Sequence, residues 1–390
     1  MKQGGRNSAL GLLSVLVLAT GCGASSSSAT PGETGGTDAG SDAVVGQDAG
    51  TSGGSGTDGA SGAGQDAGTA GDGDAEGASG TGSDGGSLDG SVTPVSVHGQ
   101  LGIDGDKLVD QNGKTVTLHG MSMYPWNQKG LQFYNASAVG HLAKDWEATV
   151  LRIPILPASV ASQTALVEAV VKACIANGIY AIIDWHCEGA CEAGPASTFF
   201  ASMATEFGNT PNVIYETWNE PTTQTWATVE AYHETVIAAI RAIDPDNVIL
   251  CGEPQWDQVP QEAAASPITT SKNIAYTFHF YAASHPLASF GPNVTKAMNL
   301  GAAIFVSEYG TCKSTGNGTF DPTETQLWWN FLDANNISSA NWSVETNGET
   351  AAALNASASA TGPWSAADLT ESGTLVTQYI QSMYAATIAP

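Results

Sequence analysis

Two glutamates stand four residues apart in YETWNEP, residues 215–221, and a third lies near the end of the apolar run IFVSEYG, residues 304–310. Hydrolysis of an acetal needs two carboxyl groups, one to protonate the leaving oxygen and one to attack or stabilise the anomeric carbon. We therefore interpret Glu220 and Glu308 as a candidate catalytic pair. Glu216 is on the same strand face as Glu220 but one layer deeper, because strand side chains repeat every two residues. We interpret Glu216 as a buried structural acid.

Both segments belong to a series of short, apolar, β-branched runs, which we predict to be strands. The eight runs are residues 115–120, 149–155, 178–186, 212–220, 247–254, 273–281, 302–310 and 338–345. Amphipathic stretches lie between most of them, and we predict helices over 164–177, ended by Gly178, and over 225–244. An Asn-Gly pair at 112–113 predicts a hairpin before the first run. Eight strands alternating with helices are typical of an α/β fold of the (β/α)8 (TIM) barrel type.

In a (β/α)8 barrel the chemistry lies at the carboxyl ends of the strands. Polar and aromatic residues end the predicted runs, and we expect them to form one ring. They are His119, Gly120, Arg152, Asp184, His186, Asn219, Glu220, Glu253, His279, Tyr281, Glu308 and Trp342. Within this ring we interpret His119 and Asp184 as supporting residues.

Six motifs occur in a characteristic order along these runs: LRIP, IDWH, VIYETWNEP, YTFHFYA, IFVSEYGT and NWSVE. Together they resemble glycoside hydrolase family 5, and most closely its bacterial endoglucanase subfamily, over about residues 100–385. The resemblance implies a retaining endo-β-1,4-glucanase that cleaves cellulose or related β-glucans by double displacement. It implies a polysaccharide as the binding partner and needs neither a cofactor nor a metal.

The resemblance also implies roles for individual residues. Glu220 would be the general acid and base, and Glu308 the nucleophile. Arg152 would keep Glu308 ionised, and Tyr281 would hydrogen-bond it. Asn219 would hydrogen-bond the sugar 2-hydroxyl, and His279 would lie near the acid/base. His186 would orient either sugar hydroxyls or the acid/base region.

Aromatic residues would bind the glycan, because the C–H faces of a pyranose pack on flat apolar rings. Trp342 would be the stacking platform at the cleavage site, with Trp256 and Trp126 in flanking subsites. Two positions differ from the family: Asn347 stands where a lysine is common, and Tyr124 where a histidine is common, although Glu349 remains. These differences leave a β-mannanase, a mixed-linkage glucanase and a chitosanase as alternatives.

The amino-terminal part of the chain has a different composition. Residues 1–22 have the pattern of a bacterial export signal, and the small residues before Cys22 resemble a lipoprotein signal. Residues 23–95 contain no aromatic residue, lysine or arginine, which predicts a flexible linker. We expect residues 96–390 to be the catalytic domain of an exported protein. It would be secreted or anchored through lipidated Cys22 at the outer membrane or cell surface.

The net charge and the cysteines bear on binding partners and on disulfide pairing. The formal net charge of −26 argues against binding of nucleic acid, and we expect a monomer. Cys187 and Cys191 are close enough in the chain to pair in an oxidising compartment.

A surface lipoprotein that binds glycans without cleaving them is the rival hypothesis. Such a binder is expected to have lost Glu220, Glu308, Arg152 or Asn219, and all four are present.

Overall fold

The computed structural model describes residues 92–389. The predicted export signal, Cys22 and nearly all of the predicted linker lie outside the described residues. Among the described helices, residues 157–177 are long and apolar enough to cross a membrane by length and composition. This segment packs against two strands of the barrel, which accounts for its apolar side chains.

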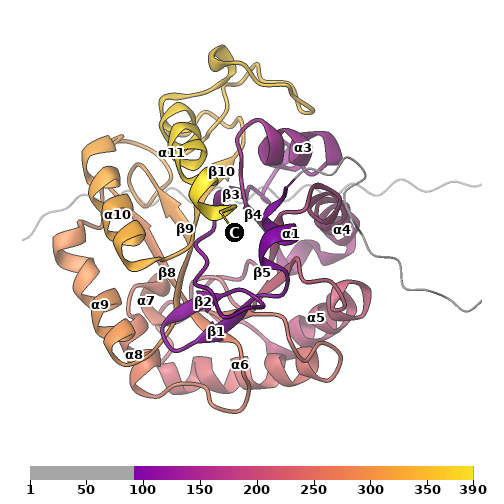
Figure 1. The fold of residues 1–390 in the computed structure, drawn as a ribbon, viewed down its shortest axis with the longest axis vertical. Helices are drawn as coiled ribbons and strands as arrows, with labels where there is room; N and C mark the ends of the chain where they lie inside the picture. The colour runs from indigo at the N-terminus through magenta and orange to yellow at the C-terminus, as the bar shows by residue number, and fades with distance from the viewer. Residues whose placement is uncertain (1–91, 390) are drawn as a thin grey trace, which may run out of the picture. The chain divides into compact units, whose positions relative to one another are not determined.

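Eight parallel strands close into a barrel at the centre of the described residues (Figure 1). In chain order they are β3 (His119–Met123), β4 (Val150–Ile155), β5 (Tyr180–Trp185), β6 (Val213–Glu216), β7 (Ile249–Cys251), β8 (Ile274–Tyr281), β9 (Ile304–Gly310) and β10 (Ser339–Val344). Each strand pairs with the next, and β10 closes the barrel on β3. The predicted (β/α)8 barrel is confirmed.

Helices surround the barrel, as Figure 1 shows. They are α1 (Pro94–His98), α2 (Gln128–Leu131), α3 (Ala136–Lys144), α4 (Val160–Asn177), α5 (Ala193–Phe207), α6 (Trp226–Arg241), α7 (Pro254–Asp257), α8 (Pro260–Ala265), α9 (Leu287–Asn299), α10 (Pro322–Asn335) and α11 (Glu371–Thr387). Short 3-10 turns cover Pro157–Ser159 and Ala366–Asp368. The predicted helix over 164–177 is the carboxyl-terminal part of α4, and Gly178 ends it at φ 66°, as a left-handed cap requires. The helix predicted over 225–244 is α6.

An antiparallel hairpin, β1 (Gly102–Asp104) with β2 (Lys107–Val109), precedes the barrel. Leu101 and Leu108 pack with inward-facing barrel residues, so this region covers the amino end of the barrel. The predicted turn at the Asn-Gly pair is confirmed, because an antiparallel Val109–Thr115 bridge and a hydrogen bond from the Asp110 N–H to the Lys114 carbonyl close it. The regular ladder of β1 and β2 turns earlier, at Gly105.

The first barrel strand also differs from its predicted range of 115–120, because β3 begins at His119 and runs on to Met123. His119 therefore lies at the amino end of the barrel and packs edge-on against Tyr379. Its expected place in the ring at the carboxyl ends was wrong. Gly120 has a packing role, since a Cβ there would lie 1.7 Å from the carbonyl oxygen of Val150.

Strand periodicity connects the apolar core to the polar layer above it. Val150, Ile182 and Ile214 belong to the apolar cluster inside the barrel. Two positions further along the same strands stand Arg152, Asp184 and Glu216, all fully buried. Because alternate residues of a strand share one face, the spacing that builds the core also directs these charged groups into the barrel.

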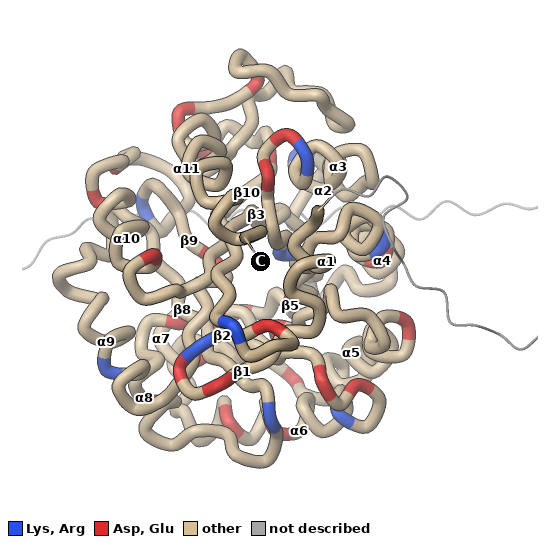
Figure 2. Tube along the Cα trace, viewed as in Figure 1, with Lys and Arg blue, Asp and Glu red and all other residues tan. Residues whose placement is uncertain are grey.

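Acidic residues greatly outnumber basic residues in this chain. The chain has 38 Asp and Glu against 12 Lys and Arg. In the described part, the lysines and arginines are scattered over several elements (Figure 2). Arg152 is an exception, because its side chain is buried inside the barrel.

Candidate active site

A single guanidinium organises the polar layer. Arg152 donates from Nε and Nη2 to the two carboxylate oxygens of Glu216, at 2.9 and 2.8 Å. It also donates from Nη1 to Glu308 at 2.7 Å and from Nη2 to the amide oxygen of Asn219 at 2.6 Å. Asp184 lies 3.0 Å from the same Nη2. The planar fork of arginine thus fixes four side chains from three strand ends and one loop.

Glu308 is held as a carboxylate. Arg152 donates to one of its oxygens and the Tyr281 hydroxyl donates to the other at 2.6 Å. Burial alone would raise the pKa of Glu308, but the charge of Arg152, with smaller help from His279, His186 and Tyr281, brings it below its ordinary value. The side chain is therefore ionised and oriented by two donors.

The pKa of Glu220 is shifted in the opposite direction from that of Glu308. Strand β6 ends at Glu216, and Glu220 follows in a loop with φ 50°. Burial, followed by the negative charge of Glu308, raises the pKa of Glu220 well above its ordinary value. His279 Nδ1 lies 3.0 Å from Glu220 Oε1, and the Glu220 side chain is 16 % exposed. Two carboxyl groups whose pKa values are moved apart are suited to one acidic and one anionic role.

The two groups are close in space. One side-chain donor or acceptor atom from each of Glu220, His279 and Glu308 lies within 4.8 Å of the other two. This approach fits a carboxyl separation of about 5–5.5 Å better than one of about 6.5–9.5 Å. The same three residues have the spacing of a metal site, but a cation there would compete with Arg152 for Glu308.

One half of a groove begins at this pair. It encloses about 230 Å³ and is lined by Tyr124, Trp126, His186, Glu188, Asn219, Glu220, Tyr281, Glu308, Ser314, Thr315, Gly316, Trp342 and Glu349. Trp342 lies parallel to His186, and Trp126 meets Trp342 edge-on at 5.8 Å. Trp126 is 44 % exposed, so its ring remains available to a ligand.

The other half continues past the same carboxyl groups. It encloses about 480 Å³ and is lined by Glu188, Glu220, Trp256, Gln258, His279, Tyr281, His285 and Ser314. Trp256 is 48 % exposed. Because Glu220 and Tyr281 line both halves, the groove passes across the carboxyl pair and has room for a chain on either side of it.

Supporting contacts fix His186 as a neutral ring. Its Nδ1 lies 2.7 Å from Asp184. Burial first and then the charge of Arg152 lower the pKa of His186 to about 3. The contact with Asp184 occupies Nδ1, so Nε2 is the ring nitrogen left for a ligand.

Most of the predicted site residues line the groove, but Arg152 and Asn347 line neither half. Arg152 lies behind the lining, bonded to Glu308, and the amide oxygen of Asn347 accepts from the backbone N–H of Glu349 at 2.8 Å. Glu253 is buried away from both halves.

Sequence reasoning missed Glu188, which lines both halves of the groove. It follows Cys187, which forms the expected disulfide with Cys191. Its place two residues after the strand-end His186 was the available signal.

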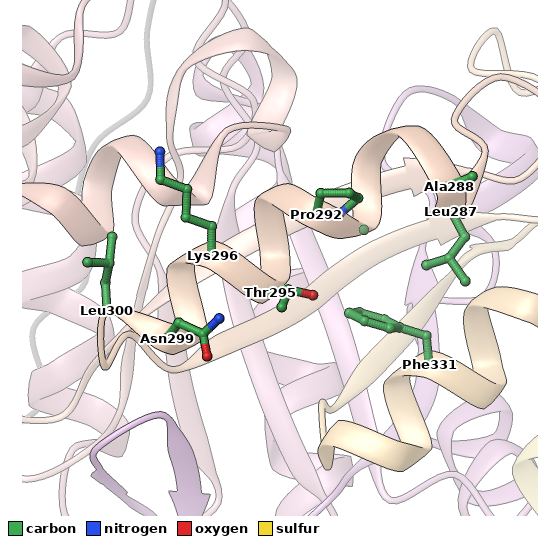
Figure 3. A pocket seen from close by; sticks show the side chains of 9 residues that line it. Leu287, Ala288, Pro292, Thr295, Lys296, Asn299, Leu300 and Phe331 are labelled. Carbon is green, nitrogen blue, oxygen red and sulfur yellow. The ribbon is translucent and has the colours of Figure 1, made fainter. Parts of the chain in front are cut away.

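A larger cavity of about 580 Å³ lies in the outer helical layer (Figure 3). It is lined by residues of α9 and the segment following it, with Phe331 of α10. Its lining contains no acid, histidine or cysteine, so it offers no group for acid–base or nucleophilic chemistry.

Comparison with known proteins agrees with this geometry. Residues 109–348 match the family model described as cellulase, glycosyl hydrolase family 5. Endoglucanase Z of Dickeya dadantii is 41 % identical over 304 residues, covering 75 % of this chain and 67 % of that protein. An endoglucanase of Clostridium saccharobutylicum is 38 % identical over 301 residues, covering 73 % and 66 %. The chain thus spans about two thirds of the length of these relatives.

Solved structures show the same similarity. A structure from Cytophaga hutchinsonii superposes with a TM-score of 0.73 at 42 % identity, covering 75 % of this chain and 98 % of the other. The catalytic domain of a Thermobifida fusca endoglucanase superposes with a TM-score of 0.69 at 31 % identity, covering 74 % and 99 %.

Proposed function

This chain belongs to glycoside hydrolase family 5, and from that premise we propose that it is a retaining endo-β-1,4-glucanase. Glu308 is the nucleophile and Glu220 the general acid and base. The observation that carries this proposal is the pair itself: two carboxyl groups within 4.8 Å, one with a lowered and one with a raised pKa.

The reaction has two steps. In the first, Glu308 attacks the anomeric carbon while Glu220 donates its proton to the departing glycosidic oxygen, which breaks the C–O bond and leaves a glycosyl ester on Glu308. In the second, Glu220, now a carboxylate, takes a proton from water. The resulting hydroxide oxygen displaces Glu308, which restores both groups and retains the anomeric configuration.

Neighbouring residues set the orientation and the protonation state of the groups that would contact the substrate. Arg152 and Tyr281 hold Glu308 in its ionised form and aim its free electron pair. Because Arg152 has only N–H donors, the oxygen of Asn219 must face it, and the amide nitrogen is left to donate to the sugar 2-hydroxyl. His186 offers Nε2 to a second hydroxyl.

The groove supports a polymeric β-glucan as substrate. It extends on both sides of the carboxyl pair and exposes Trp126 and Trp256 as stacking surfaces. Its relatives carry the name endoglucanase, and a Thermobifida fusca relative 30 % identical to this chain was solved with cellotetraose.

Chitosan is a second candidate substrate. Glu188 and Glu349 line the groove beside the catalytic pair without being part of it. Carboxylates at these positions would pair with the ammonium groups of glucosamine units.

We further propose that the catalytic domain occupies residues 96–390, with residues 1–22 directing export and residues 23–95 linking it to a lipid anchor on Cys22. Replacing Cys22 by alanine is expected to release the protein from the membrane fraction.

A product profile tests the substrate. We expect release of oligosaccharides from carboxymethylcellulose and barley glucan to exceed release from mannan and chitosan. Proton NMR during hydrolysis of a cello-oligosaccharide is expected to show the β-anomer first, and an α-anomer formed first would contradict the double displacement.

A further inference from the structure

The turn that carries Trp256 is joined to the loop that carries Glu220. The backbone N–H of Gln255 donates to the carbonyl of Thr222, and that of Trp256 donates to the carbonyl of Pro221, both at 2.9 Å. Trp256 and the proposed acid/base are therefore parts of one connected unit.

This unit has an unusual backbone. Gln255, Trp256 and Asp257 have φ values of 60°, 58° and 56°, and Glu220 has 50°. For residues other than glycine, the left-handed conformation is unfavourable, and it persists only where the surroundings hold it. Four such residues meet at one side of the groove.

The Asp257 carboxylate binds two backbone N–H groups of this unit, those of Glu253 and Glu220. It is fully buried, and its Oδ1 accepts from the backbone N–H of Glu253 at 2.6 Å. Its Oδ2 accepts from the backbone N–H of Glu220 at 3.2 Å and lies 3.5 Å from His279 Nδ1. That nitrogen is the one that lies 3.0 Å from Glu220 Oε1.

We propose that Asp257 is a positioning residue for the acid–base step: it fixes the backbone of Glu220 and shares the Nδ1 side of His279 with the Glu220 side chain. The inference rests on the proposed function, because it assigns a role through Glu220. Asp257 itself does not reach the substrate groove, since it lines neither half.

The tautomer of His279 supports this arrangement. Ser307 donates its hydroxyl proton to Glu216 at 3.1 Å, so it accepts from His279 Nε2 at 2.9 Å. His279 therefore carries a proton on Nε2 and presents Nδ1 to both Glu220 and Asp257. The position of the Glu220 proton then depends on where Asp257 holds the backbone and the ring.

Neighbouring charged groups shift the pKa of Asp257 in both directions. Burial raises the pKa of Asp257 to about 7, with His279 opposing the shift and Glu220 and Glu216 adding to it. Burial, together with the charge of Asp257, raises the pKa of the adjacent Glu253 well above its ordinary value. Any change at Asp257 therefore reaches Glu220 through both a hydrogen bond and a charge.

The test uses two substrates that differ in their need for a proton. Hydrolysis of 2,4-dinitrophenyl β-cellobioside releases a stable anion without acid assistance, whereas phenyl β-cellobioside needs the Glu220 proton. For Asp257→Asn we expect kcat/KM to fall about 10- to 100-fold on the phenyl substrate and by less than about twofold on the dinitrophenyl substrate. A merely structural role would lower both values equally.

Two further variants complete the design. Asp244→Asn, at a fully buried aspartate that also accepts backbone N–H bonds but lies in the loop between α6 and β7, is the matched control and should not separate the substrates. Should Asp257→Asn fail to fold, Asp257→Glu keeps the charge but displaces the carboxylate, and it should show the same discrimination to a smaller degree.

Glu220→Gln distinguishes a failure of the proposed function from a failure of the role proposed for Asp257. If it does not discriminate between the substrates, the proposed function fails. If it discriminates while Asp257→Asn and Asp257→Glu lower both substrates equally, or neither, the role of Asp257 is overturned and the proposed function stands.

Discussion

The two ends of the barrel treat buried aspartates differently. At the amino end, Asp244 accepts from the backbone N–H groups of Asp246 and Asn247, both at 3.0 Å. Its second oxygen accepts from the hydroxyl of Tyr215 and the amide of Asn247, both at 2.8 Å. Every donor is neutral, and the result is a turn held firmly in place.

At the carboxyl end, several buried acids share few cations. Asp184, Glu216 and Glu308 all surround Arg152. Within the described residues, one oxygen of Asp184 and both oxygens of Glu253 accept no hydrogen bond. Partly satisfied buried acids are costly, and they displace pKa values. The comparison indicates that one end of the barrel is built for stability and the other for tuned protonation.

Removing either carboxyl group of the proposed catalytic pair tests the carboxyl end of the barrel most severely. For Glu220→Gln we expect the rate on cellulose derivatives to fall about 10²- to 10⁴-fold, because the proton donor is lost. For Glu308→Gln we expect a loss at least as large, because no covalent intermediate can form. Initial rates on carboxymethylcellulose measure both, and circular dichroism should show a folded barrel. Substantial activity in Glu308→Gln would falsify the assignment.

The pH dependence of stability separates the two ends next. Burial raises the pKa of Asp184 to about 7, against an unfolded value near 4. A raised pKa means that the folded state holds the proton longer, so this contribution is present below about pH 4 and is lost as the pH rises through 7. We expect wild type to lose on the order of 2–4 kcal/mol from this group between these limits.

Asp184→Asn should flatten that dependence. Urea unfolding at pH 5 and pH 8 gives the two free energies, and only their difference is compared between variants. An equally steep dependence in Asp184→Asn would assign the effect to other acids of the ring.

Asp244→Asn tests the stable end. An amide cannot accept at both oxygen positions, so we expect unfolding to become easier by about 1–3 kcal/mol. Activity per folded molecule should remain that of wild type, because Asp244 does not approach the groove. Thermal unfolding and kcat on a cello-oligosaccharide measure the two quantities, and a large fall in kcat would contradict the separation of the two ends.

The smallest effect is expected at the groove surface. Because the Trp256 ring is 48 % exposed, Trp256→Ala should leave stability within about 1 kcal/mol. It should weaken binding of a long glucan by about 1–2 kcal/mol through loss of stacking. Gln258→Ala, at a neighbouring polar position of the same groove half, is the control. Equal KM values for Trp256→Ala and wild type on polymer would remove Trp256 from the binding surface.

Sequence and structure agree best where the information is local. The buried strands show as apolar runs, and Gly178 shows as a helix end, because both depend on residues a few positions apart. The prediction failed at His119, whose run extended four residues too early for the strand that formed. Asp257 was missed because no pattern of neighbouring residues marks it, and Glu188 was missed although it follows His186 by two residues.

The sequence by itself determined the order of the strands and which of their residues face inward, because strand periodicity depends on neighbouring residues. Only the tertiary structure decided that Glu220 and Glu308 approach within 4.8 Å, and that Arg152 lies beside one of them and not the other. Closure of the barrel joins groups far apart in the chain. Their pKa values then follow from burial and charge at those distances, which no local pattern specifies.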